Sequence, residues 1–336
     1  MRKQEKLSAL IIYNEPGNDA ALDDKDTLVQ VEHVSKALTG LGVRNACRVF
    51  SLDFPDFSRE ITREKPDFVF NLVESLENRD SLAYIVPEFL EILEIPYTGA
   101  SSQSMYLCGN KLLIKKILLC SNIPAPSCFC LTDPMLQHFR KGSYILKSVS
   151  EHASSSITDN SILDVTDADI LRGTLLELRN SKHTEYFAEQ YIPGREFSIS
   201  LIGDFETVDC LPVVELRFHK YPDGKPEIYS YQAKWDETSF EYQHVERLFE
   251  HPKSDLPLIA RIKKLARSCW TAFHLKGYAR MDFRVDVRNR PWLIDINVNP
   301  CISPDSTFFT ACEQAGYSYQ DMVKKIVKMA VSRSIF

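Results

Sequence analysis

The chain has 336 residues, of which 44% are hydrophobic and 26% are charged. This composition is typical of a folded protein with two or three domains, and it argues against an intrinsically disordered chain. The formal net charge is -6 and Lys and Arg form no cluster, so we expect no nucleic-acid partner and no membrane-surface partner.

The nine cysteines are scattered and include no Cys-x-x-Cys pair. An odd number of isolated cysteines predicts neither a disulfide framework nor a structural zinc site. The apolar run near the N-terminus covers only residues 7–13, which is too short for a signal peptide or a membrane span. We therefore expect a cytoplasmic protein.

The N-terminal third alternates between expected strands and helices. Residues 7–13 indicate a buried strand, and Thr27 with Gln30 has capping-box spacing at the start of a helix that Gly40 and Gly42 end. Further strands are expected at residues 43–50, 67–73 and 95–98, with a helix at residues 84–93. This order predicts a parallel α/β domain that closes near residue 102.

The middle of the chain carries a lysine at a position of interest. A helix expected over residues 110–120 leads to a strand at residues 143–149, which contains Lys147, and then to a loop of small and polar residues, 150–156. A strand followed by such a loop suits a phosphate clamp, because successive backbone amides can bind an anion. It equally suits a surface turn beside a solvated lysine.

The C-terminal half is expected to be rich in strands. Thr166 and Asp169 mark the start of a helix to residue 180, and Ser318 with Asp321 marks a last helix to about residue 332. Strands are expected at residues 185–192, 197–202, 207–216 and 228–233, and a helix at residues 257–274.

Residues 277–300 have the pattern of an antiparallel hairpin, with Asn289 and Arg290 at a tight turn. The first half places Ala279, Met281, Phe283, Val285 and Val287 on one face and Arg280, Asp282, Arg284 and Asp286 on the other. The second half places Trp292, Ile294, Ile296 and Val298 on one face and Leu293, Asp295, Asn297 and Asn299 on the other. Such alternation is typical of half-buried strands.

The register of this hairpin decides its chemistry. An even-length loop sets both apolar faces on one side of the sheet, which places Asp282 opposite Asp295 or Asn297, with Arg280 nearby. Two carboxylates and an amide oxygen are ligands that Mg²⁺ prefers when it also binds phosphate. A solvated sheet face with salt bridges would show the same pattern.

Seven motifs in order carry a resemblance to a known family. They are Pro96-Tyr97-Thr98-Gly99, Asn110-Lys111, Tyr144-Ile145-Leu146-Lys147, Ala188-Glu189-Gln190-Tyr191-Ile192 with Gly194-Arg195-Glu196-Phe197, Ala233-Lys234-Trp235, Arg280-Met281-Asp282-Phe283, and Asp295-Ile296-Asn297 with Asn299-Pro300. With these motifs the sequence resembles the ATP-grasp superfamily, and within it the D-alanine-D-alanine ligase family over nearly the whole chain.

The resemblance implies an ATP-grasp fold, which is α/β overall and α+β in its C-terminal part. An N-terminal parallel α/β domain, residues 1–103, would be followed by two α+β subdomains that clasp ATP. These are a central subdomain, residues 104–187, and a C-terminal subdomain, residues 188–336, that holds the metal and catalytic site.

The resemblance also implies roles for individual residues. Lys111 and Lys147 would face the phosphates of ATP, Glu189, Gln190, Tyr191 and Ile192 would meet the adenine, and Glu196 would hold the ribose hydroxyls. Asp282, Asp295 and Asn297 would bind two Mg²⁺ ions, for which Mn²⁺ can substitute, and the family usually has Glu where this chain has Asp295. Arg280 would steady the transferred phosphoryl group, Lys234 would face the reaction centre from the end of a strand, and Ser306 would touch the second substrate.

Two departures from the family pattern concern loops. The phosphate-covering loop of the family is rich in glycine, whereas residues 151–156 contain none, so Ser154 and Ser155 are the candidates for the clamp. The N-terminal loop whose glutamate holds the first D-alanine is absent, and Glu15 lacks the motif around it. Glu74 is expected to face the cleft, or else to cap a helix.

The activity implied is that of an ATP-dependent carboxylate-amine ligase. Its family activates a carboxylate as an acyl phosphate, which an amine then attacks, leaving an amide, ADP and phosphate. Trp235, where the family usually has Tyr or Phe, and the missing N-terminal loop favour substrates other than two D-alanines. A catalytically impaired ATP-binding module and an ATP-grasp kinase are the alternatives. The partners are small-molecule carboxylates and amines, and a homodimer is one option for the assembly.

Overall fold

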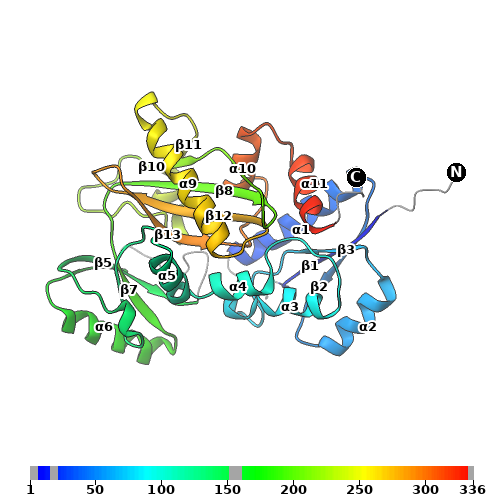
Figure 1. The fold of residues 1–336 in the computed structure, drawn as a ribbon, viewed down its shortest axis with the longest axis horizontal. Helices are drawn as coiled ribbons and strands as arrows, with labels where there is room; N and C mark the ends of the chain where they lie inside the picture. Colours follow the sequence, from blue (N-terminus) through cyan, green and yellow to red (C-terminus); the bar gives the residue numbers. More distant parts are fainter. Residues whose placement is uncertain (1–6, 16–21, 151–160, 332–336) are drawn as a thin grey trace.

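The computed structural model describes residues 7–15, 22–150 and 161–331. Three β-sheets and the helices packed on them make up this part of the chain (Figure 1). No helix within the described ranges is both long and apolar enough to cross a membrane.

The N-terminal sheet is parallel, with strand order β2-β1-β3. Its elements are β1 (Ser8–Tyr13), α1 (Leu22–Gly40), β2 (Arg44–Val49), α2 (Phe54–Glu64), β3 (Phe68–Asn71) and α3 (Ile85–Ile92). Successive residues of β1 point to opposite faces, so Ile11 packs with α1 while Ile12 packs with α2 and α3. The predicted parallel α/β arrangement is confirmed.

Two details of this region differ from the prediction. Helix α1 begins at Leu22, so Thr27 lies inside it, only 1% exposed, and does not cap it. Residues 95–98 form no strand, because Tyr97 makes only an isolated bridge to Val69. Gly42, at φ +79°, does follow the end of α1 as expected.

The central sheet is antiparallel, with strand order β4-β7-β5-β6. Its elements, with the helices around them, are α4 (Ser102–Cys108), α5 (Lys111–Cys120), β4 (Cys128–Phe129), β5 (Gly142–Ser148), β6 (Ile162–Val165), α6 (Ala168–Lys182) and β7 (Tyr186–Gln190). Helix α6 buries Leu171 and Leu175 against this sheet, and Asp167, not Thr166, caps it. The predicted boundary between the central and C-terminal subdomains, at residues 187 and 188, falls inside strand β7. The division of the chain into domains therefore stays a prediction.

The largest sheet has the order β11-β10-β8-β12-β13, with β9 paired to β8. Its strands are β8 (Arg195–Gly203), β9 (Val208–Cys210), β10 (Val214–Phe218), β11 (Val245–Leu248), β12 (Gly277–Val285) and β13 (Pro291–Asn297). Helix α9 (Leu256–Ala272) covers one face, where Ile199 and Met281 are fully buried. The alternate residues of β8 and β12 therefore point away from α9, toward the central sheet.

Two predicted strands of this half have a different structure. Residues 207–216 form two strands, β9 and β10, instead of one. Residues 228–233 form no strand, and Tyr231–Trp235 is a short helix, α7, whose cap Ser230 accepts a hydrogen bond from the Ala233 amide at 3.3 Å. Lys234 and Trp235 thus lie on a helix and not at the end of a strand. A second short helix, α8 (Phe240–Gln243), follows, and short 3₁₀ helices lie at Asp80–Leu82, Pro134–Leu136 and Lys253–Asp255.

The hairpin of β12 and β13 has the predicted register where it matters for the site. Asp282 lies opposite Asp295, and Arg280 lies opposite Asn297. A β-bulge then shifts the pairing by one residue, so that Phe283 lies opposite Leu293 and leaves Ile294 as the extra residue.

The bulge also corrects the predicted faces of β13. Leu293 is 0% exposed and packs in the core with α9, whereas Trp292 and Ile294 are only partly buried. The loop spans five residues, 286–290, with Asn289 at φ +54°, instead of the expected two-residue turn. An odd-length loop together with one bulged residue restores the register that an even-length loop would give.

The C-terminal helices pack beside helix α1 of the N-terminal sheet (Figure 1). Helices α10 (Thr307–Gln314) and α11 (Tyr319–Ala330) share a core with α1, in which Phe308 and Met322 are fully buried. The predicted capping box of Ser318 and Asp321 is present at the start of α11. The two ends of the described chain therefore pack together.

Candidate functional site

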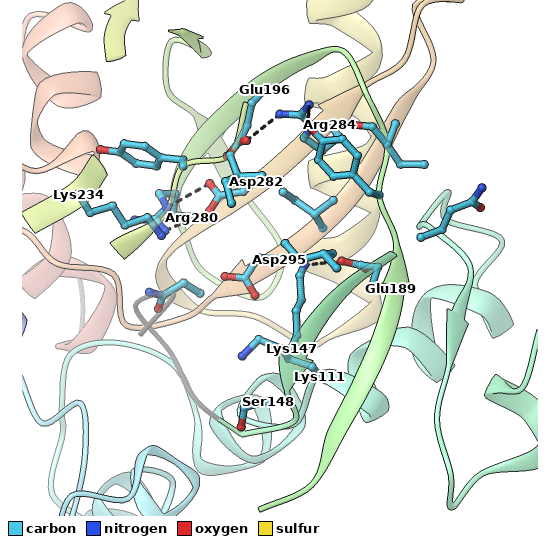
Figure 2. Close-up of a pocket in the computed structure, with 18 of the residues that line it drawn as sticks. Lys111, Lys147, Ser148, Glu189, Glu196, Lys234, Arg280, Asp282, Arg284 and Asp295 are labelled. Carbon is cyan, nitrogen blue, oxygen red and sulfur yellow. Dashed lines mark hydrogen bonds and ion pairs between the residues drawn. The ribbon is translucent and has the colours of Figure 1, made fainter. Parts of the chain in front are cut away.

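A cavity lies between the central sheet and the uncovered face of the largest sheet (Figure 2). It brings together most of the predicted site residues, namely Lys111, Lys147, Glu189, Gln190, Tyr191, Ile192, Glu196, Lys234, Arg280, Asp282, Asp295 and Asn297. Glu74, Ser148, Tyr229, Trp235, Arg284, Ile294 and Cys301 also line it. Residues far apart in the sequence therefore share one site.

Of the three predicted serines, only Ser306 lies in the described part of the chain, and it is not among the residues that line the cavity. Ser306 caps α10, where its Oγ accepts a hydrogen bond from the Phe309 amide at 3.1 Å. Its contact with a second substrate stays a prediction. Ser154 and Ser155 lie outside the described residues.

A buried cluster of charges forms where α5 meets the central sheet. Glu189 on β7 forms ion pairs with both Lys147 on β5 and Lys115 on α5, and its side chain is 1% exposed. Burial alone would raise the pKa of Glu189, but the two lysines outweigh burial and lower it. Glu189 thus stays charged and holds Lys147 in place.

Lys115 is a residue that the sequence analysis missed. It lies four positions after Lys111 on α5 and is 5% exposed. Residues four apart share a helix face, so the spacing was a usable signal, although its carboxylate partner on β7 was not evident from the sequence.

The predicted metal ligands lie on neighbouring strands of the largest sheet. Asp282 accepts hydrogen bonds from Ser198 Oγ at 2.6 Å and from Arg280 Nε and Nη2, each at 3.1 Å. Asp295 faces it across the hairpin, and Asn297 lies two residues further on the same strand. In the parts of the chain described, no three His, Cys, Asp or Glu side chains gather closely enough to hold a metal ion. A cation here would therefore also need the Asn297 amide oxygen and oxygens of the ligand.

Two cations approach these carboxylates from different elements. Arg280 lies on β12, where Asp282 holds its pKa above the ordinary value despite burial. Lys234 comes from α7, and its ammonium lies 5.3 Å from the centre of the Tyr229 ring. Burial, and next the charge of Arg280, lower the pKa of Lys234 to about 8. Figure 2 shows Lys234 extending toward Arg280 and Asp282.

Arg284 on β12 organises the other end of the cavity and was also missed. It is 4% exposed and donates to Glu196 Oε2 at 3.0 Å, to the Ile192 carbonyl at 3.0 Å and to the Gly194 carbonyl at 2.8 Å. A Cβ at Gly194 would lie 2.2 Å from the Val285 carbonyl oxygen, so this close approach requires glycine. Arg284 shares a strand face with Arg280 and Asp282, which was the signal in the sequence.

Glu74, which follows strand β3 of the N-terminal sheet, also lines the cavity. Its Oε1 accepts a hydrogen bond from Gln30 at 3.1 Å, and its backbone amide donates to Asn14 Oδ1 at 3.1 Å. Cys301, which also lines the cavity, lies 2.9 Å from Asp26 Oδ2. The expectation that Glu74 faces the cleft is confirmed.

Comparisons with known proteins identify the family. The family model described as "D-ala D-ala ligase C-terminus" matches residues 152–328, more than half of the chain. A D-alanine--D-alanine ligase of Bordetella avium is 27% identical over 300 residues, which cover 86% of this chain and 88% of that protein. The enzyme of the same name from Bordetella parapertussis is 29% identical over 250 residues, 73% of each chain.

Solved structures show the same fold. The D-alanine--D-alanine ligase of Bacillus anthracis complexed with ATP has a TM-score of 0.71 at 20% identity, with 96% of this chain and 97% of that chain covered. The VanG D-Ala:D-Ser ligase of Enterococcus faecalis has a TM-score of 0.69 at 14% identity, with 97% and 100% covered. The expected ATP-grasp fold is confirmed, and with the match of the family model the chain belongs to the D-alanine-D-alanine ligase family of ATP-dependent ligases.

Proposed function

We propose that the protein is a Mg²⁺-dependent ligase that uses ATP to activate a carboxylate as an acyl phosphate and then joins the acyl group to an amine. The observation that carries this proposal is the meeting of Lys234 and Arg280 with Asp282, Asp295 and Asn297 in one cavity. Phosphoryl transfer depends mostly on positioning and on cations that stabilise the charge on the transferred group. The relatives named as D-alanine--D-alanine ligases also support a ligase activity.

ATP would lie along the cavity from β7 to the hairpin. Residues Glu189 to Ile192 would meet the adenine, and Lys111 and Lys147 would face the phosphates. Glu196 would accept hydrogen bonds from the ribose hydroxyls, and its buried ion pair with Arg284 keeps that carboxylate oriented.

The residues present suit Mg²⁺, because two carboxylates and an amide are hard oxygen donors. Asp282 already accepts hydrogen bonds from Ser198 and Arg280, but a carboxylate has about four lone-pair sites and can still bind a cation. Asp282, Asp295 and Asn297 would hold two Mg²⁺ ions, which would neutralise the phosphate oxygens when bound. Mn²⁺ is expected to substitute.

The reaction then follows in two steps. A substrate carboxylate oxygen attacks the γ-phosphorus, and the bond to the bridging oxygen breaks, which leaves ADP and an acyl phosphate. The amine attacks the acyl carbon, phosphate departs and one proton is released, which yields the amide. Arg280 and Lys234 would hold the negative charge that develops on the transferred phosphoryl group and on the tetrahedral intermediate.

We further propose that two D-alanines are poor substrates. Trp235 lines the cavity next to Lys234, and an indole offers only a hydrogen-bond donor where a tyrosine hydroxyl would also accept. Trp235 Nε1 is buried and has no hydrogen-bond partner in the described part of the chain.

A phosphate-release screen tests the proposed function. The pure protein would be mixed with Mg-ATP and panels of D- and L-amino acids, dipeptides and small carboxylates, with mass analysis of the products. We expect phosphate release that depends on both an acid and an amine. A phosphorylated product without an amide would instead identify a kinase, and ATP binding without any release would identify a binding module.

A further inference from the structure

The buried cluster of Glu189, Lys147 and Lys115 contains two cations but a single anion. The three side chains are 1%, 9% and 4% exposed, and Glu189 forms an ion pair with each lysine. Cys128 lies opposite Glu189 on β4, but burial raises the pKa of its thiol to about 12, so it adds no negative charge. The cluster therefore carries an excess of positive charge.

This excess charge calls for an explanation. One lysine would be enough to neutralise Glu189, and a further buried cation is costly because it loses its contact with water. Burial alone would lower the pKa of Lys147, but Glu189 outweighs burial and raises it, so Lys147 stays charged. Asp295 and Glu196 also attract Lys147, more weakly than Glu189 does. Since Lys147 and Glu189 line the cavity, an anionic ligand there would offset the excess (Figure 2).

Lys115 can act on such a ligand through Glu189. It is not among the residues that line the cavity, and its Nζ lies 3.5 Å from the Leu293 carbonyl oxygen on β13. The two oxygens of Glu189 are divided between the lysines, because Oε1 pairs with Lys115 and Oε2 with Lys147. Without Lys115, Lys147 would have to balance the carboxylate by itself, and the pair would be neutral.

We propose that Lys115 is a positioning residue for nucleotide binding, which balances the charge of Glu189 from outside the cavity and so leaves the positive charge of Lys147 to attract the phosphates. This inference rests on the proposed function, because it assigns the nucleotide to this cavity. It adds to that function a residue that does not touch the ligand.

The test compares the affinities for Mg-ATP and for adenosine, measured by calorimetry, in the wild type and in Lys115→Met. The ratio of the two affinities reports the contribution of the phosphates, because effects on adenine and ribose binding cancel. Two unit charges about 10 Å apart, at an effective dielectric constant of about 20, attract with an energy equivalent to about a tenfold change in affinity or more. We therefore expect the ratio to fall about tenfold in Lys115→Met.

Lys116→Met is the matched control. Lys116 is the next residue of α5, its side chain is 36% exposed, and it pairs with Asp133. The same substitution there removes a lysine and an ion pair from the same helix but leaves the charge of the buried cluster intact. The ratio of affinities should not change.

A second substitution separates the charge of Lys115 from a merely structural role. Glu189→Gln removes the carboxylate, so the double variant Lys115→Met with Glu189→Gln has the same net charge in the cluster as the wild type. Its ratio of affinities should return to the wild-type value, whereas Glu189→Gln alone should exceed it. If Lys115→Met does not fold, the comparison of the double variant with Glu189→Gln measures the same loss.

Two outcomes would overturn this inference while the proposed function stands. One is a wild type that binds ATP and a ratio that Lys115→Met leaves unchanged. The other is a loss in Lys115→Met that Glu189→Gln does not reverse, which would make Lys115 a structural residue only. A wild type that binds no ATP would instead contradict the proposed function, and this inference with it.

Discussion

Asp282 and Asp295 face each other across the hairpin. At the scale of single residues, we predict that ATP turnover depends on the negative charge of each. Asp295→Asn and Asp282→Asn keep the shape of the side chain but remove a charge from the expected metal site. Each should lower ATP turnover at least about 100-fold, the size typical of losing one strong electrostatic contributor. Steady-state phosphate release with saturating Mg²⁺ measures this effect.

Asp209→Asn provides the control for these variants. Its carboxylate is 63% exposed and pairs with Lys325 on the surface, outside the cavity, so turnover should not change. Near-normal turnover in both hairpin variants would contradict the metal site and favour the alternative interpretation, in which this face of the sheet is solvated and carries only salt bridges.

The pKa of Lys234 predicts that the affinity for nucleotide depends on pH. Burial and the charge of Arg280 lower its pKa to about 8, so the ammonium is mostly charged at pH 7 and loses its proton as the pH rises above 8. The affinity for a non-hydrolysable ATP analogue should therefore fall toward high pH, by up to tenfold per pH unit. Calorimetry between pH 6 and 10 measures this.

The variant Lys234→Arg isolates the source of that dependence. A guanidinium stays charged over this range, so the decline above pH 8 should disappear even if the overall affinity is lower. A wild-type affinity that stays constant to pH 9.5, or an identical decline in the variant, would show that Lys234 does not bind the phosphates.

The sequence predicted the residues of the hairpin well, because a strand repeats every two residues and the charged set stands out. It did not predict Lys115 or Arg284, whose roles depend on partners in other elements. Lys115 meets Glu189 only because α5 packs beside β7, and Arg284 binds carbonyls of a segment about 90 residues earlier. Such contacts are tertiary, and neither periodicity nor composition encodes them.

At the scale of elements, the bulge in β13 explains why strict alternation of residues predicted the wrong faces for Leu293 and Ile294. Ile294 is inserted between the pairs of Phe283 with Leu293 and of Asp282 with Asp295. The bulge reverses which residues of β13 point to the core, so Leu293 points to the core and Ile294 lines the cavity. Helix α7 was missed for a related reason, because five residues are too few to establish a helical period.

Gly277, the first residue of β12, supports a stability prediction. It has φ +81°, and a Cβ there would lie 2.6 to 2.7 Å from backbone atoms of Gly99. Gly277→Ala should lower the free energy of unfolding by about 2–4 kcal/mol, from backbone strain and overlap with neighbouring atoms. Urea denaturation monitored by fluorescence would measure it.

Gly173→Ala is the opposite case and serves as the control. Gly173 lies within α6, and a Cβ would meet nothing within 4 Å. Alanine should stabilise the helix by about 0.5–1 kcal/mol. Equal stability of the Gly277 variant and the wild type would mean that the approach of β12 to Gly99 is looser than the structure indicates.

At the scale of the whole molecule, the cavity draws residues from every part of the described chain. Glu74 follows a strand of the N-terminal sheet, Lys147 lies in the central sheet and Asp295 lies in the largest sheet. The seven motifs predicted this fold through their resemblance to the D-alanine-D-alanine ligase family, whereas the alternation of strands and helices predicted only its N-terminal parallel sheet. The packing of α10 and α11 with the N-terminal helix α1 was not predicted, since the apolar face of a helix does not specify which element it packs against.

The central claim is that ATP activates a carboxylate in this cavity, and transfer of ¹⁸O tests it most directly. The acid substrate found by the screen would be labelled with ¹⁸O in its carboxylate and incubated with Mg-ATP and the amine. If an acyl phosphate forms and the amine displaces phosphate, each released phosphate should carry one ¹⁸O, with one ADP and one amide formed. Unlabelled phosphate, or a phosphorylated product that accumulates without amide, would contradict the account.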